Sequence, residues 1–262
     1  MIQDAAPHPQ QATLEFFGPI VLAYLVVCAA WLSAYQLRPQ WWDRQPEGAS
    51  TRPWLDLGLA LLGAVGVLAM GEAYRQGWRI PDGSGGWRHV TFNLNVLLWY
   101  APIGIVLLSR RQSLGTVWLS ARRLGIKLAV GAALSLLGLA VYLGLRGELD
   151  RFAAVLLDCG SAHSLAHALP VFLEAVAVAF LVVRLRWALG LKVGLIVPCL
   201  LFALAHVPRG IDGGQPVDVI AKFFALNSLL PLAIFATVAR SRDVVWIGVV
   251  HYVLDVAIEA FR

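Results

Sequence analysis

Long apolar stretches, separated by short polar segments, make up most of this chain. Each stretch runs for about 18 to 22 residues, the length that a helix needs to cross a hydrocarbon core about 30 Å thick. The pattern therefore predicts an all-α fold, a polytopic membrane helix bundle with about eight transmembrane helices. The expected helices cover residues 17–36, 54–74, 92–109, 126–145, 164–183, 191–207, 219–239 and 244–260.

The segments between these stretches are rich in Gly, Pro and charged residues. The two longest, 37–53 and 75–91, are predicted loops that could not fold by themselves. No repeat of about 20 to 50 residues is visible, which argues against a duplicated transporter. We therefore expect one integral membrane domain over residues 1–262. Four glycines inside the expected helices should let helices approach closely. These are Gly66, Gly131, Gly138 and Gly144.

The composition indicates that the bilayer is the solvent of this chain. Of its 262 residues, 59% are hydrophobic and 14% are charged, against about a quarter charged in ordinary globular domains. The net charge of +5 does not indicate nucleic acid, because most Lys and Arg lie in short segments between apolar runs. The three cysteines form neither a CxxC pair nor an even set, so no disulfide scaffold or zinc knuckle is expected.

The positions of the basic residues favour an orientation with both termini outside the cytoplasm. In that orientation, thirteen of the 21 Lys and Arg residues belong to the four cytoplasmic loops. The loop at 75–91, with three Arg, weakens this bias. We expect an integral protein of the bacterial inner (plasma) membrane with extracytoplasmic termini. The thirteen residues are Arg38, Arg44, Arg52, Arg110, Arg111, Arg122, Arg123, Lys127, Arg184, Arg186, Lys192, Arg240 and Arg242.

Four ionisable residues inside expected helices are the main candidates for chemistry: Glu174, His206, His251 and Asp255. A charge at the bilayer centre costs about 2.5–3.5 kcal/mol on insertion scales, so such residues usually face the bundle interior and serve a function. His251 and Asp255 are four residues apart and share one helix face. Two imidazoles and two carboxyl groups around a hydrated pocket could activate water. Two histidines and a carboxylate are also a ligand set for a divalent metal such as zinc, so the metal question stays open.

The same residues carry a resemblance to a known family. Residues 202–206 (FALAH) fit the motif Phe-x-x-x-His, and residues 251–255 (HYVLD) fit His-x-x-x-Asn/Asp. Both motifs belong to the CAAX protease and bacteriocin-processing (CPBP) family of intramembrane proteases, which the chain resembles over residues 165–262. That family's first motif, Glu-Glu-x-x-x-Arg, falls on residues 174–179, where only the first Glu is present. The resemblance rests on three patterns in the family's order, each in a separate expected helix.

The resemblance implies a glutamic-type endopeptidase that hydrolyses a peptide bond of membrane-anchored or lipidated protein substrates. By this resemblance Glu174 is the general base for water, and His206 and His251 stabilise the oxyanion or hold the nucleophile. Asp255 could compensate for the missing second Glu. Arg184 is a poor substitute for the missing Arg, because it lies about 15 Å along the helix from Glu174. The expected partners are a membrane-anchored protein or peptide and the lipid bilayer, and no nucleic acid.

Other interpretations fit the same residues. Without the second Glu and the Arg, the chain could be a degenerate protease serving as a scaffold, or a proton-coupled carrier. Glu174 could be a protonated carboxyl that forms a hydrogen bond with a neighbouring helix. His163 and His167 are four residues apart and could be ligands, but His167 lies about 10.5 Å along the helix from Glu174, so they are interpreted as outer-surface histidines. Ser161 lies in a predicted loop and has little weight as a nucleophile, and Glu259 is expected near the membrane interface.

Overall fold

The computed structural model describes residues 9–39, 42, 50–81, 83–206 and 217–261, and the side chains of 9–17, 205–206 and 217–227 lie outside that description. All regular structure in the described residues is helical. The α-helices are α1 (Pro9–Leu37), α2 (Pro53–Arg75), α3 (Trp87–Ser109), α4 (Leu124–Arg146), α5 (Phe152–Cys159), α6 (Ala162–His206), α8 (Val217–Ser241) and α9 (Val245–Glu259). Two short 3-10 helices, η2 (Leu114–Val117) and η3 (Leu149–Arg151), flank α4.

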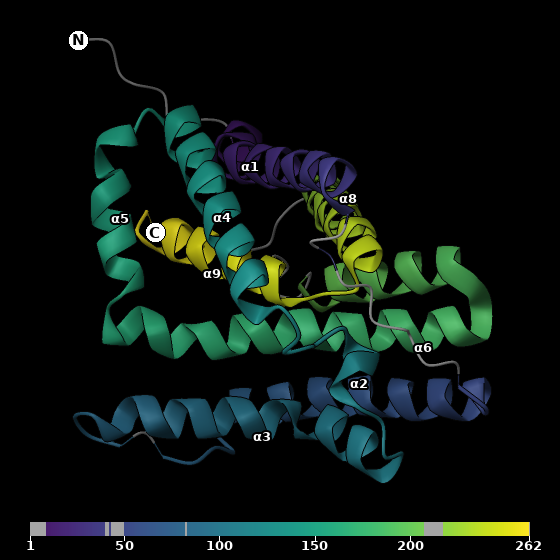
Figure 1. The fold of residues 1–262 in the computed structure, drawn as a ribbon. Helices are drawn as coiled ribbons and strands as arrows, with labels where there is room; N and C mark the ends of the chain where they lie inside the picture. The colour runs from purple at the N-terminus through teal and green to yellow at the C-terminus, as the bar shows by residue number, and fades with distance from the viewer. Residues whose placement is uncertain (1–8, 40–41, 43–49, 82, 207–216, 262) are drawn as a thin grey trace.

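The expected helices are all found, but two of them are joined. Residues 184–190, predicted as a loop, are helical up to a kink at Gly190, where φ is +83°. This left-handed conformation suits glycine, which has no Cβ to clash with the backbone. At this kink α6 turns back on itself (Figure 1). The short helix α5 was not expected.

Five helices in the described part of the chain are long and apolar enough to cross a membrane. The α-helical membrane bundle is therefore supported, whereas the expected count of about eight spans is not confirmed. The candidate spans are Gly18–Leu37, Pro53–Arg75, Trp87–Ser109, Leu124–Arg146 and Ala162–Leu204.

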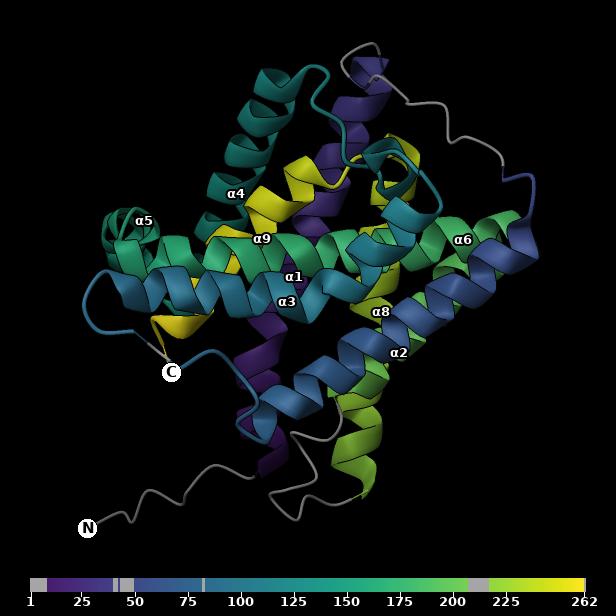
Figure 2. The ribbon, with the colours of Figure 1, turned by 90° about the horizontal axis from the view of Figure 1, so that it is seen from below.

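Helix α6 forms the centre of the arrangement. It packs against α2 and α3 on one side and against α8 and α9 on the other (Figure 1). Helix α4 packs on both α1 and α9, and α1 also contacts α8. Two views show that α6 and α3 run along one direction while α1 and α8 run across it (Figure 2). The core therefore lies where crossing helices meet.

The outward faces of α2 and α3 are apolar and exposed. Leu62 and Val65 of α2 are 67% and 61% exposed, and Ile105 and Leu108 of α3 are 63% and 80% exposed. Exposed apolar side chains in such numbers are unfavourable in water but suit contact with lipid tails. These faces support an integral membrane protein.

Three of the four glycines stand where neighbouring helices come close, as predicted. A Cβ added at Gly131 would lie 3.0 Å from the backbone oxygen of Trp246 on α9. At Gly138 it would lie 3.0 Å from Val27 Cγ2 of α1, and at Gly66 it would lie 2.9 Å from Pro102 Cβ of α3. A Cβ at Gly144 would meet nothing nearer than 3.9 Å, which is ordinary contact.

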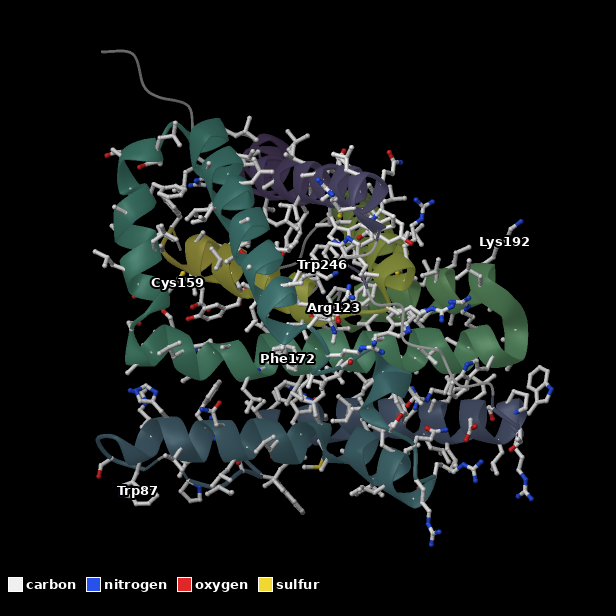
Figure 3. The ribbon with its side chains drawn as sticks, in the orientation of Figure 1. Trp87, Arg123, Cys159, Phe172, Lys192 and Trp246 are labelled. Atoms are coloured by element: carbon white, nitrogen blue, oxygen red, sulfur yellow. The ribbon has the colours of Figure 1, made fainter. Side chains whose placement is uncertain are left out.

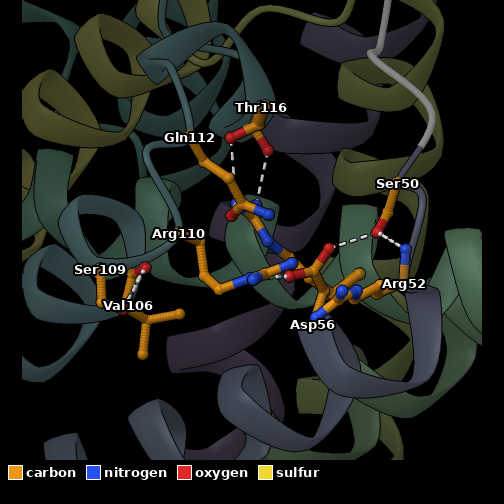
Figure 4. A network of polar contacts seen from close by, with 9 residues as sticks. Ser50, Arg52, Asp56, Val106, Ser109, Arg110, Gln112 and Thr116 are labelled. Carbon is orange, nitrogen blue, oxygen red and sulfur yellow. Dashed lines mark hydrogen bonds and ion pairs between the residues drawn. The ribbon is translucent and has the colours of Figure 1, made fainter.

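Arg184 is a buried structural residue of α6 and not a loop charge. Its guanidinium is fully buried and donates to the backbone oxygen of Thr116 and to Gln112 Oε1, both at 2.6 Å. Beside it, Asp56 of α2 pairs with Arg110 at 2.7 Å (Figure 4). Arg184 therefore ties α6 to the connection between α3 and α4. Because Arg184 marks no membrane face, the charge bias for the orientation is smaller than the sequence indicated, and the orientation stays a prediction.

Candidate functional site

A cavity of about 200 Å³ lies where α1, α6, α8 and α9 meet. Glu174 of α6 and His251 and Asp255 of α9 line it together. Most of the remaining wall is apolar and comes from all four helices, including Phe202 and Phe235. With about 30 Å³ for each water molecule, the space could hold about six. The structure thus brings three of the four candidate residues to one cavity.

Glu174 sits on a well-packed part of α6. Its neighbours Ala175 and Val178 also line the cavity, and both are buried. Glu174 itself is half-buried. The buried side chains of Ala175 and Val178 therefore fix the part of α6 that holds the carboxyl group at the cavity wall.

The start of α9 is anchored by a buried ion pair. Asp243, in the turn before α9, accepts a hydrogen bond from the Val245 nitrogen at 2.8 Å and pairs with Lys127 of α4. Burial raises the pKa of the Asp243 carboxyl, and the charge of Lys127 opposes that shift. The Val244 nitrogen also donates to the backbone oxygen of Trp118 at 3.0 Å. These contacts fix the first turn of the helix that carries His251 and Asp255.

The middle of α9 lies directly against α6. A Cβ added at Gly248 would lie 2.8 Å from Phe172 Cδ2 of α6. Figure 3 shows Phe172 on α6 and Trp246 at the start of α9. Further along, the Tyr252 hydroxyl donates to the backbone oxygen of Cys159 at 2.5 Å. The close approach places His251 and Asp255 at the same cavity as Glu174.

The cavity also contains Tyr24 of α1, which the sequence did not indicate. Tyr24 is only 6% exposed, and its ring meets that of His251 edge to face with centroids 6.3 Å apart. It lines the cavity together with Asp255 and Glu174. A tyrosine inside an apolar run is the only sequence signal, and it is weak because tyrosine carries no charge at neutral pH.

His206 is the last residue of α6, and its side chain lies outside the described residues. Phe202, the first residue of the Phe-x-x-x-His motif, lines the cavity. The motif therefore begins at the candidate site. Within the described part of the chain, Glu174, His251 and Asp255 are not gathered closely enough to form a metal-binding group by themselves.

One other candidate from the sequence has a structural role. Ser161, between α5 and α6, accepts a hydrogen bond on its Oγ from the Ser164 nitrogen at 3.1 Å. This contact caps the N-terminus of α6. Cys28 and Cys199 are buried free thiols.

Comparisons of the chain with family models, curated proteins and solved structures found no match. The convergence of charged and polar groups in the cavity is therefore the observation on which a function is proposed.

Proposed function

We propose that this chain is an intramembrane endopeptidase of the CPBP type, which hydrolyses a peptide bond of a membrane-anchored or lipidated protein. The observation that carries the proposal is the cavity shared by Glu174, His251 and Asp255, which lies among apolar helices. Acidic and imidazole side chains are energetically costly among apolar membrane helices, so those that are present usually serve a function. The two motif segments at residues 202–206 and 251–255 both contribute to this cavity.

In the proposed reaction, the Glu174 carboxylate removes a proton from a water molecule in the cavity. The oxygen of that water adds to the carbonyl carbon of the substrate peptide bond. His206, His251 and the Tyr24 hydroxyl donate hydrogen bonds to the resulting oxyanion, whose stabilisation is a large contribution to catalysis in such sites. Glu174 then gives its proton to the leaving nitrogen as the C–N bond breaks. Asp255, one turn from His251, orients the imidazole.

The apolar wall limits which substrates can enter. Phe202, Phe235 and Ile247 present hydrocarbon to the cavity, so the peptide beside the cleaved bond should be apolar. A lipid-attached or membrane-anchored segment suits such a cavity and is already concentrated in the bilayer. We therefore place the substrate within the membrane or at its surface.

The Glu174→Gln and His251→Ala variants should each abolish processing while the protein still inserts and accumulates. Removal of a general base costs about 10²–10⁴ in rate. The measurement is a comparison of membrane-protein C-termini, by mass spectrometry, in cells with and without the gene and with each variant. Matched controls are Glu72→Gln, at an exposed residue of α2, and His89→Ala at the start of α3. Full processing by Glu174→Gln would disprove the assigned base.

The same experiment distinguishes the proposed enzyme from the alternative functions of scaffold and proton-coupled carrier. If deletion of the gene changes no C-terminus, the chain is a scaffold or a proton-coupled carrier, which the missing second Glu and Arg would also fit. A C-terminus that changes on deletion and is restored by Glu174→Gln would indicate an indirect role. Hydrolysis at this site is supported only if the control variants restore a C-terminus that the cavity variants fail to restore.

We also propose that both termini lie outside the cytoplasm of a bacterial inner membrane, with the cavity open to that side. Arg184 and Lys127 are buried and are left out of the count of loop charges. The other Lys and Arg residues of the cytoplasmic loops still support this orientation. A phosphatase reporter fused after Arg262 should be active, because it folds only outside the cytoplasm. Fluorescence from a cytoplasmic reporter at the same position would show that the C-terminus lies in the cytoplasm, opposite to the proposed orientation.

A further inference from the structure

Three potential metal ligands meet away from the cavity, at the end of the molecule where α6 begins and α9 ends. They are His163 and His167 of α6 and Glu259 of α9, whose ligand atoms all lie within 4.8 Å of one another. The two imidazole rings have centroids 4.9 Å apart. His163 and Glu259 are exposed and His167 is half-buried, so the group lies at the protein surface. The two histidines thus lie at the surface, and Glu259 from another helix lies beside them.

The chemistry of this group suits a divalent transition metal. Histidines at positions i and i+4 of a helix point the same way and can bind one ion, as in metalloprotease helices. Imidazole nitrogen and carboxylate oxygen are typical zinc ligands, with bond lengths of about 2.0–2.2 Å. Tetrahedral ligands at such lengths lie about 3.4 Å apart. Ligand atoms already within 4.8 Å need only small side-chain rotations to reach that spacing.

The surrounding contacts hold the three residues in place. Ser161 caps α6 two residues before His163, and the ring of Phe92 packs on His167 with centroids 5.1 Å apart. At the end of α9, Arg151 donates to the backbone oxygen of Ala260 at 3.1 Å, next to Glu259. Both helix ends are thus fixed independently of any metal, which is the preorganisation that a binding site requires.

We propose that His163, His167 and Glu259 bind a divalent transition metal of the zinc class, with water at the fourth position. The ion clamps the start of α6 to the end of α9. The ion is separate from any ion in the cavity, since Glu174 lies about 10.5 Å along α6 from His167. Asp255 lies one turn before Glu259 on α9, so the clamp fixes the spacing of the helices that carry the cavity residues. The assignment does not depend on the proposed protease function.

The test uses the full-length protein in detergent, with any affinity tag removed, titrated with Co²⁺ and Zn²⁺. We expect one equivalent of Co²⁺ with the absorption spectrum of a nitrogen- and oxygen-ligated ion. The variants His163→Ala/His167→Ala and Glu259→Gln should weaken binding by at least about tenfold. Glu259 is exposed, so its substitution should leave the fold intact, which circular dichroism checks. The controls His89→Ala and His251→Ala should bind as the wild type does.

A second measurement, of thermal unfolding, tests whether the bound ion links the two helices. Zn²⁺ should raise the temperature of unfolding of the wild type and of His89→Ala, and should leave that of Glu259→Gln unchanged, because an ion stabilises only the state that binds it. Unchanged Co²⁺ affinity in the double histidine variant would overturn the proposal. Loss of the bound ion in His251→Ala alone would overturn it too, because it would place the metal in the cavity.

Discussion

A tyrosine hydroxyl supplies the cavity with a hydrogen-bond donor that brings no charge into the membrane. Tyr24 lies beside His251 and lines the same cavity as both carboxyls. Glu174, His251 and Asp255 could be selected from the sequence, because charged groups are conspicuous in apolar helices. Tyr24 could not be selected in this way, since its role depends on α1 packing beside α9, which residue spacing does not encode.

Tyr24→Phe removes only the hydroxyl and keeps the packed ring. If this hydroxyl stabilises the oxyanion, kcat for peptide hydrolysis should fall by about 10²–10³, the usual cost of one such donor, with KM little changed. The measurement is turnover of a substrate identified from the C-terminal comparison, in detergent or in liposomes. Tyr35→Phe, farther along α1, is the matched control. Equal rates for Tyr24→Phe and wild type would remove Tyr24 from the mechanism.

At the scale of elements, α9 is held by close contact with α4. Gly131→Ala would place a methyl group 3.0 Å from the backbone oxygen of Trp246, which cannot move without moving α9. We expect a loss of about 1–3 kcal/mol in the free energy of unfolding, as for other overpacked cores. The measurement is denaturant unfolding in detergent.

Gly104→Ala in α3 is the control for this substitution. Its added methyl meets nothing within 4 Å, so it should gain about 0.5–1 kcal/mol from the lower backbone entropy of alanine. If both variants unfold alike, the close contact between α4 and α9 does not contribute to stability.

The ion pair between Lys127 and Asp243 connects α4 to the turn before α9. Lys127→Met leaves a buried carboxylate without its partner, which typically costs about 3–5 kcal/mol. Lys127→Met/Asp243→Asn should recover part of that loss, because the asparagine oxygen can still accept the Val245 hydrogen bond that Asp243 accepts now. Unfolding of the single and double variants measures this difference. A double variant less stable than Lys127→Met would show that the charge on Asp243 is not the source of the loss.

Element prediction succeeded where the apolar pattern was long and failed where packing decided the outcome. The expected helices were found because hydrophobic length alone defines them. Residues 184–190 were predicted as a loop because they contain two Arg, yet Arg184 is helical and buried. Its partners Gln112 and Thr116 lie in a distant connection of the chain, and no local pattern identifies such partners.

At the scale of the whole molecule, the class was predictable and the arrangement was not. Low charge and long apolar runs are sufficient to indicate a membrane protein. The direction in which helices cross, visible in Figures 1 and 2, depends on side-chain packing between distant segments. The group formed by His163, His167 and Glu259 was missed for the same reason, since its third member comes from the last helix.

The composition of the cavity wall has a consequence for biosynthesis. Glu174 reaches the membrane about 80 residues before Asp255, which corresponds to about 4–16 s at translation rates of about 5–20 residues per second. During that time α6 has no α9 beside it, so the carboxyl of Glu174 lacks both His251 and Asp255. Under the proposed hydrolase function, the site would be incomplete while its own nascent helices and those of neighbouring chains are exposed in the translocon. Late completion of the site would then protect the cell from cleavage of unfinished membrane proteins.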